Sequence, residues 1–183
     1  LLGTGKKLFL NASVGSETTN FNVSFVDPYI FDLNLSAGLT AFNYTRDMDS
    51  YDYAQQGGSL TLIRPLTEFT KLSGRYRYEK GTVDNIDIDA GSYIKSQVGT
   101  TTISSFMLGM NKNTIDNIMN PTRGMNATLS FELAGSILGG QADFYKAIAT
   151  YGRYFPAGFW NSQFFVRGTA GTTGSYNGST VPV

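Results

Sequence analysis

The opening Gly3-Thr4-Gly5-Lys6-Lys7 has the glycine and lysine content of a phosphate-binding loop. In such a loop, backbone N–H groups and the lysine hold the phosphates, and a Ser or Thr directly after the lysine binds the magnesium ion. Lys7 stands where that hydroxyl residue should be. We therefore expect no nucleotide site here.

Two groups of aspartates have oxygen ligands of the kind that calcium prefers. They are Asp47, Asp49 and Asp52, and Asp84, Asp87 and Asp89. Neither group has the spacing, the central glycine or the terminal glutamate of an EF-hand. Solvated loops are the better interpretation, and we expect no metal site and no cofactor.

Charged side chains recur at alternate positions of several segments. The set is Lys7, Lys71, Arg75, Arg77, Glu79, Glu132, Lys146 and Arg167. In a strand these positions share one face, which must then be wet. Two interpretations stay open: a network that tunes a polar interior or docks a loop there, or charges that only solvate that interior. The spacing of Glu79 and Glu132 in the sequence does not identify a glycosidase pair, because that chemistry depends on the distance between the carboxylates.

The composition disfavours most enzyme chemistry and nucleic-acid binding. The chain has no His and no Cys, so the commonest general base and the thiolate ligands are missing. Lys and Arg total 14 and Asp and Glu total 14, which leaves no basic excess for nucleic acid. With 183 residues and no change of composition along the chain, we expect one unit and no enzyme.

Alternation of polar and apolar residues is the dominant pattern. In residues 20–26, Phe21, Val23 and Phe25 alternate with Asn20, Asn22 and Ser24 before Asp27-Pro28-Tyr29 ends the run. A strand with this pattern separates an apolar medium from a polar one. Because the pattern recurs with aromatic residues near the strand ends, the sequence predicts a transmembrane β-barrel.

Nine segments carry this pattern and are predicted as antiparallel up-and-down strands. They are 6–15, 20–26, 33–44, 55–63, 71–79, 101–111, 125–134, 144–154 and 163–171, and residues 172–183 are predicted as loop. Single-chain bacterial barrels have an even number of strands, so nine predicts a partial barrel. The alternative is a closed barrel of eight strands, with one segment miscounted. The chain lacks a leader segment and an initial Met, so we expect it to begin after processing or inside a longer protein.

The connections predict an orientation. Short turns with Pro and aromatic residues (27–31, 64–69, 155–159) alternate with longer polar loops (46–53, 80–98, 135–142), and the turn at 113–123 is wider. Bacterial barrels have short periplasmic turns, so the Pro-containing turns are predicted to be periplasmic. Aromatic girdles are then expected at both interfaces. The periplasmic girdle is Tyr29, Phe31, Phe69, Tyr154, Phe155, Phe159 and Trp160, and the outer one is Tyr44, Tyr51, Tyr53 and Tyr78.

Several short motifs together resemble the BamA family of outer-membrane assembly factors over the whole chain. They are Leu2-Gly3-Thr4-Gly5-Lys6, Val26-Asp27-Pro28-Tyr29, Arg64-Pro65-Leu66-Thr67-Glu68-Phe69, Pro121-Thr122-Arg123-Gly124, and Tyr145-Lys146-Ala147 through Tyr154-Phe155-Pro156. The resemblance implies that residues 1–183 are about the third to the eleventh strand of a barrel of about sixteen strands, ending within the sixth extracellular loop. The periplasmic turn positions it implies are Asp27, Pro28, Tyr29, Arg64, Pro65, Pro121, Gly124 and Pro156.

This resemblance also implies a function. The family folds and inserts β-barrel proteins into the bacterial outer membrane, through POTRA domains and a seam between the first and last strands, which are both absent from these residues. Val166-Arg167-Gly168 is followed by Thr169 and is not equated with the family's Val-Arg-Gly-aromatic motif. The implied partners are outer-membrane lipids and lipopolysaccharide, unfolded outer-membrane proteins as clients, and accessory lipoproteins bound by other regions; nucleic acid is not among them. Two alternatives stay open: a two-partner or autotransporter secretion pore of the same superfamily, and a small self-contained porin-like barrel.

Overall fold

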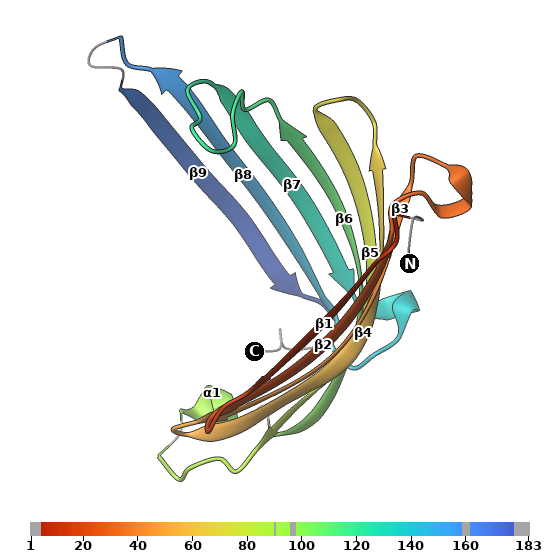
Figure 1. Cartoon of the computed structure of the whole chain (residues 1–183). Helices are drawn as coiled ribbons and strands as arrows, with labels where there is room; N and C mark the ends of the chain where they lie inside the picture. The colour runs from red at the N-terminus through yellow and green to blue at the C-terminus, as the bar shows by residue number, and fades with distance from the viewer. Residues whose placement is uncertain (1–4, 90, 96–97, 159–161, 178–183) are drawn as a thin grey trace.

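The computed structural model describes residues 5–89, 91–95, 98–158 and 162–177. Nine antiparallel strands form one sheet in which each strand pairs with the next in the chain (Figure 1). The strands are β1 (Lys7–Val14), β2 (Thr18–Asp27), β3 (Ser36–Met48), β4 (Tyr51–Pro65), β5 (Thr70–Asp84), β6 (Gly99–Asn113), β7 (Gly124–Ala134), β8 (Phe144–Pro156) and β9 (Gln163–Ser175). The predicted all-β, up-and-down architecture is confirmed.

An unbroken register gives the sheet two distinct faces. Residues paired across neighbouring strands project to the same side, and the pairing advances residue for residue within all eight strand pairs. One row on the apolar face consists of Leu8, Phe25, Leu39, Leu60, Tyr76, Phe106, Leu133 and Tyr145. The neighbouring row on the polar face includes Ser24, Thr40, Ser59, Arg77 and Ser105.

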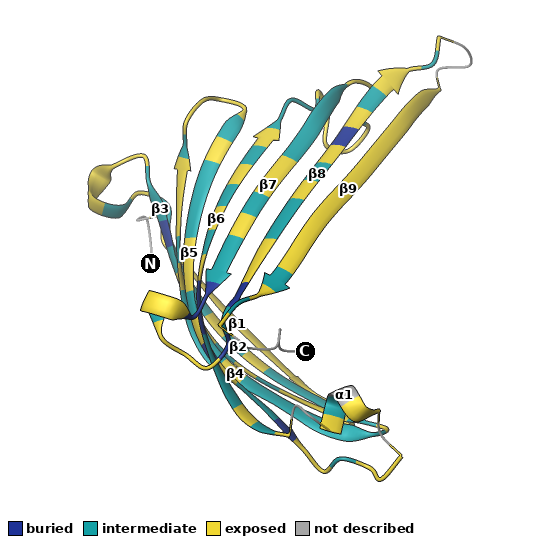
Figure 2. Cartoon of the chain, turned by 180° about the vertical axis from the view of Figure 1, so that it is seen from behind, coloured by how far each residue is buried: buried dark blue, intermediate teal, exposed yellow. Residues whose placement is uncertain are grey.

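The large apolar side chains lie outside, not in a core. Among the described residues, the buried hydrophobic ones are Ala37, Val83, Ala134, Ala142 and Phe144. By contrast, Leu10 is 72% exposed and Leu39 is 58% exposed. Figure 2 shows exposed positions spread along the strands and almost the whole of β9 exposed. An apolar surface of this extent is stable only against an apolar medium or another apolar surface.

Most strands are longer than the alternating pattern predicts. The predicted loop 46–53 is a tight hairpin in which Met48 pairs with Tyr51 and only residues 49–50 lie between β3 and β4. Similarly, β5 continues to Asp84 and β9 continues to Ser175, through residues predicted as loop. Both faces of these extensions carry polar residues, so the alternation that marks a strand stops although the hydrogen-bonded ladder continues.

β3 begins three residues later than predicted. β3 starts at Ser36 instead of residue 33, because residues 28–35 form a connection that contains the short helix η1 (Ile30–Asp32). Phe31 and Asp32 adopt positive φ angles of 55° and 57° there. The long connection after β5 contains a second short helix, α1 (Ser92–Lys95).

The loop between β7 and β8, residues 135–143, covers part of the sheet edge. β6 extends beyond the end of β7, which leaves backbone groups of β6 without a strand partner. Gly135 donates its N–H to the Ser104 carbonyl at 2.9 Å, and Gln141 donates to the Thr102 carbonyl at 2.7 Å. The loop thereby satisfies polar backbone groups that would be costly to leave unpaired.

The predicted outer aromatic girdle is wrong for three of its four tyrosines. Tyr44 pairs in register with Gln55, which donates a hydrogen bond to Glu79 on the polar face. Tyr51 and Tyr53 alternate with Ala54 and share the side of Gln55. Only Tyr78 of that set lies on the apolar face. The short hairpin at 49–50 keeps the alternation in phase, so these rings stay with the polar residues.

The predicted periplasmic girdle is wrong for one residue, Tyr154. Tyr154 lies on the polar face and stacks on Phe165, with ring centroids 4.4 Å apart. Phe155, its neighbour, projects to the apolar face. Tyr29, Phe31 and Phe69 are exposed, and their role in a girdle stays a prediction. Phe159 and Trp160 lie outside the described residues.

Connection lengths do not separate the two ends of the sheet. The Pro-containing end has connections 28–35, 66–69, 114–123 and 157–162, whereas the other end has 15–17, 49–50, 85–98 and 135–143. The two shortest connections are therefore at the end predicted to carry the long loops. Because those two hairpins extend the ladder beyond the apolar part of the strands, loop length alone gives no orientation.

Candidate functional site

The polar face carries every charged residue that the sequence placed there. By register and alternation, these are Lys7, Lys71, Arg75, Arg77, Glu79, Glu132, Lys146 and Arg167, from strands β1, β5, β7, β8 and β9. Sharing a face does not bring all of them into contact. The structure joins three of them directly.

Arg77 is the centre of this three-residue cluster. Its Nη1 lies 3.5 Å from Glu79 Oε2 on the same strand. Its Nη2 lies 3.3 Å from Glu132 Oε1 on β7, so the side chain reaches across β6. The register partner of Arg77 on β6 is Ser105, and its small side chain leaves room for the Arg77 side chain to cross β6. One guanidinium therefore ties two carboxylates from different strands.

Glu79 is the buried member of the cluster, with only 3% of its surface exposed. Gln55 donates a hydrogen bond from Nε2 to Glu79 Oε2 at 2.8 Å. The register partner of Glu79 on β4 is Gly57, where an added Cβ would lie 2.7 Å from the Cβ of Glu79. The missing side chain of Gly57 thus leaves room for the carboxylate. A buried charge satisfied by a cation and an amide is the expected arrangement.

The remaining charges of the polar face are separate from this cluster. Arg75 donates from Nε to Thr61 Oγ1 at 3.1 Å. Lys146 pairs in register with Glu132, yet among the described residues no ion pair within 4.0 Å involves Lys146, Lys71 or Arg167. The sequence could not tell linked charges from solvated ones, because alternation assigns a face but not a partner.

The Pro-containing motifs all lie at one end of the sheet, the upper edge in Figure 1. At the first of them, the Tyr29 N–H donates to Asp27 Oδ1 at 3.1 Å, and Lys6 Nζ lies 3.0 Å from Asp27 Oδ2. Lys6 is the lysine of the phosphate-loop-like segment, and its described contact is with a carboxylate. Residues 1–4 of that segment lie outside the described residues.

Arg64 and Pro65 precede a tight turn at 66–69. The Leu66 N–H donates to the Thr70 carbonyl at 2.8 Å, and the Phe69 N–H donates to Thr67 Oγ1 at 3.3 Å. Pro156 ends β8, and the Ala157 N–H then donates to the Ser162 carbonyl at 2.8 Å. These turns are closed by local hydrogen bonds that need no partner outside the chain.

The turn with Pro121 and Gly124 is organised by Asp116, a residue that the sequence reading missed. Asp116 Oδ1 accepts N–H groups from Asn117, Thr122 and Arg123 at 3.0–3.2 Å, and its Oδ2 accepts the Thr122 hydroxyl at 2.5 Å. These hydrogen bonds, the Thr122 hydroxyl first, lower the pKa of the Asp116 carboxyl to about 2. Gly124 has φ +111°, which explains the glycine. The sequence signal that could have identified Asp116 is an aspartate six residues before a threonine in a turn.

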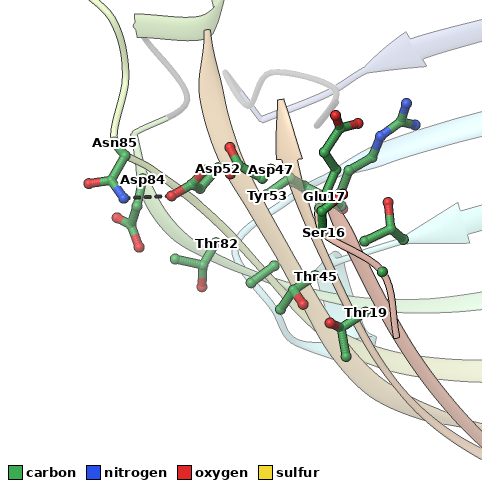
Figure 3. Close-up of a pocket in the computed structure, with 14 residues that line it drawn as sticks. Ser16, Glu17, Thr19, Thr45, Asp47, Asp52, Tyr53, Thr82, Asp84 and Asn85 are labelled. Carbon is green, nitrogen blue, oxygen red and sulfur yellow. Dashed lines mark hydrogen bonds between the residues drawn. The ribbon is translucent and has the colours of Figure 1, made fainter. Parts of the chain in front are cut away.

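The opposite end of the sheet has an acidic recess of about 370 Å³ (Figure 3). Asp47, Asp52 and Asp84 follow one another in register across β3, β4 and β5, and Asn85 donates to Asp52 Oδ2 at 2.5 Å. The row combines members of both predicted aspartate groups. Within the described ranges, no group of three acidic, His or Cys residues is arranged to hold a metal ion.

No helix within the described part of the chain is long and apolar enough to cross a membrane.

Known proteins resemble this chain in sequence and in fold. A BamA outer membrane protein assembly factor from Nitratidesulfovibrio vulgaris is 27% identical over 154 residues, which are 84% of this chain and 20% of the relative. The one from Neisseria meningitidis serogroup B is 26% identical over 174 residues, covering 85% of this chain and 22% of the relative. The chain thus spans about a fifth of the length of these relatives.

The crystal structure of BamA from Haemophilus ducreyi lacking POTRA domains 1–3 superposes with a TM-score of 0.85 at 24% identity, over 99% of this chain and 38% of that one. This likeness shows the fold. The sequence also matches the Omp85 superfamily domain over residues 1–183. With this match along its whole length, and with the two-faced antiparallel sheet that it forms, the chain belongs to the Omp85 superfamily.

Proposed function

We propose that this chain is part of the transmembrane barrel of an outer-membrane protein assembly factor, in the bacterial outer membrane. The observation that carries the proposal is the two-faced sheet, with an apolar outer band on one face and the Arg77 cluster on the other. Its relatives named as BamA assembly factors support the specific activity. The work proposed is non-covalent: the barrel assists the folding and insertion of unfolded outer-membrane proteins, without a cofactor.

Within such a barrel we assign these residues to about the third to the eleventh of about sixteen strands, with the sixth extracellular loop beginning after β9. The Pro-containing end is the periplasmic one, and the acidic recess lies at the outer surface near lipopolysaccharide. POTRA domains and accessory lipoproteins act through other regions of the protein. In this assignment the polar face lines the lumen, and the Arg77 cluster links β5 to β7 across β6.

Two neighbouring residues of β6 test the membrane placement. Leu108 lies on the apolar face, whereas Met107 lies on the polar face in register with Arg75 and Glu132. In the full-length protein, Leu108→Lys should destabilise the inserted barrel by about 2–4 kcal/mol, because its ammonium group would face lipid near the bilayer midplane. Met107→Lys adds the same charge beside a carboxylate and should insert normally. Heat-modifiable migration in gels after reconstitution into liposomes measures insertion.

Equal insertion of the two variants would contradict the assignment of faces. The activity itself is tested separately, with proteoliposomes of the unaltered full-length protein and an unfolded outer-membrane porin as client. Assisted folding should appear as faster formation of a protease-resistant, heat-modifiable porin than in empty liposomes. Transport of a passenger domain into the liposomes without assisted folding would instead identify a secretion pore.

A further inference from the structure

The apolar face ends in cations at the Pro-containing rim. On three alternate strands, the same-face residue that follows an apolar pair is basic: Arg64 after Leu60 and Leu62, Lys112 after Leu108 and Met110, and Arg153 after Ala149 and Tyr151. Each lies within three residues of the end of its strand. The three side chains are exposed, and among the described residues none takes part in an ion pair. Ion pairs among the described residues therefore do not explain their position on the apolar side.

One of these cations, Lys112, borders a groove in the apolar face. The groove has a volume of about 590 Å³ and crosses β6 to β9. Small residues form its floor, and a larger side chain and a cation border it: Ala127, Ala149, Gly168, Ala170, Tyr151 and Lys112. Its lining is mostly apolar, and its volume is that of sites that hold a small molecule.

Lys112 and Arg153 are close enough to share one anion. Lys112 pairs in register with Ala127 on β7, which pairs with Tyr151 on β8, and Arg153 is two residues further along β8. Two strand spacings and two residues of rise put the two Cα atoms about 12 Å apart, within reach of two long side chains. The Arg153 guanidinium also lies 4.9 Å from the centre of the Phe155 ring, which keeps it at the aromatic edge of the apolar band.

We propose that Lys112 and Arg153 bind the phosphate of an anionic glycerophospholipid, with one acyl chain lying in the groove lined by Ala127, Ala149, Gly168 and Ala170. The inference rests on the proposed membrane placement of the apolar face. Charge complementarity indicates what occupies the site. Two cations beside an apolar groove match a phosphodiester attached to a hydrocarbon chain. Neither part of the site suits a soluble ligand. At the opposite rim the same face carries Asp47, Asp52 and Asp84, so this phosphate site belongs to one rim only.

The test uses the full-length protein in nanodiscs of phosphatidylcholine with a minor fraction of phosphatidylglycerol. Lipids retained after transfer to detergent are identified by native mass spectrometry. The double variant Lys112→Gln with Arg153→Gln should retain phosphatidylglycerol about tenfold less well, since each basic residue near a membrane surface contributes attraction to anionic lipid. A matched double variant, Arg64→Gln with Lys80→Gln, removes two cations from the same face away from the groove and should retain it normally.

A groove variant supplies an independent check. Nothing lies within 4 Å of a Cβ built at Gly168, so Gly168→Leu fills the groove without a clash inside the protein. It should reduce retention of phosphatidylglycerol while leaving both cations in place. Gly74→Leu, on the same face beside Phe106, is its control, because a Cβ there makes only an ordinary contact at 3.6 Å.

Equal losses in the two double variants, or unchanged retention in both test variants, would overturn the lipid site. Heat-modifiable migration confirms that each variant is folded. Assisted porin folding, measured on the same preparations, should be unchanged in all of them. A protein that inserts and folds porin but shows no dependence on Lys112 and Arg153 refutes only the lipid site, whereas failure to insert at all refutes the proposed function.

Discussion

The Arg77 guanidinium shows how one residue can connect two strands, β5 and β7, that do not pair with each other in the sheet. Its two carboxylate partners differ in environment, because Glu79 is buried and the Glu132 side chain is 14% exposed. Removing the shared cation would leave both carboxylates without their ion pair. Charged groups left unsatisfied in a buried site cost more than the ion pair itself contributes.

We predict that Arg77→Met destabilises the full-length barrel by about 2 kcal/mol. Arg75→Met is the matched control on the same strand and face, and its loss of one hydrogen bond to Thr61 should cost less than about 1 kcal/mol. Urea unfolding of protein reconstituted in liposomes measures the difference. Adding Glu79→Gln and Glu132→Gln to Arg77→Met should restore part of the stability; no recovery would mean that the carboxylates do not cause the loss.

Asp116 is the second residue whose role is local and testable. Its pKa in the folded protein lies below that of an ordinary aspartate, so the ionised form is the one that the turn stabilises. The stabilisation is complete above about pH 4 and is lost as the pH falls towards 2, because protonation removes the acceptor charge. The turn at 114–123 should therefore loosen on acidification within that window.

For Asp116→Asn we predict weaker protection from amide exchange at Thr122 and Arg123 near neutral pH, relative to the intrinsic rate, and no further loss of protection down to pH 2. Hydrogen-exchange mass spectrometry of a peptide covering this turn gives the readout. Asp89→Asn, in the connection at the other end of the sheet, should leave exchange in the turn unchanged. If the unaltered turn is equally protected at pH 5 and pH 2, relative to the intrinsic exchange rate at each pH, the assigned role of the Asp116 carboxylate is wrong.

At the scale of elements, β4 and β5 approach each other most closely where Gly57 faces Glu79. A Cβ at Gly57 would lie 2.5 Å from the Tyr78 carbonyl oxygen, so a side chain there forces the two strands apart. The close approach also places Gln55 within hydrogen-bonding distance of the buried carboxylate. A glycine inside a strand thus marks a backbone contact, as it often does.

Gly57→Ala should accordingly destabilise the barrel by about 1–3 kcal/mol, the usual cost of overpacking. Gly168→Ala, where the space is open, should have an effect near zero. Both variants replace glycine by alanine in strands of the same sheet. The difference between their urea unfolding midpoints therefore measures the effect of the close contact at Gly57. Equal midpoints would show that β4 can shift at no cost.

At the scale of the whole molecule, the described sheet has two outer strands, β1 and β9, that pair on one side only. All eight residues of β1 are exposed, and β9 is exposed over almost its full length. In lipid, each unpaired backbone group would cost several kcal/mol. These edges must therefore be paired wherever the sheet lies in a membrane.

When residues 1–183 are expressed alone and refolded in detergent, we predict self-association or aggregation through these edges. Light scattering coupled to size-exclusion chromatography measures the mass, with the full-length protein as the control that should not associate through this route. A stable monomer that folds without detergent or lipid would count against both the barrel assignment and the apolar band.

The sequence by itself determined the nine strands, their order and the two faces of most of them. Alternation with a period of two is a local property, so residues such as Phe21 and Asn22 report their faces without any knowledge of partners. Pro and Gly marked the turns for the same reason. The family resemblance came from these turn motifs, and the match to the Omp85 superfamily confirms it.

Only the tertiary structure decided the features that depend on cross-strand pairing. The ladder continues to the hairpin at 49–50, so Tyr44 and Tyr53 keep the alternation of their strands and lie on the polar face, although the sequence placed them in a girdle. Arg77 meets Glu132 because register brings them within reach across β6, whereas Lys146, the register partner of Glu132, forms no described ion pair with it. A local pattern fixes where a side chain points; which side chain it meets depends on register and reach, and those are set by the assembled sheet.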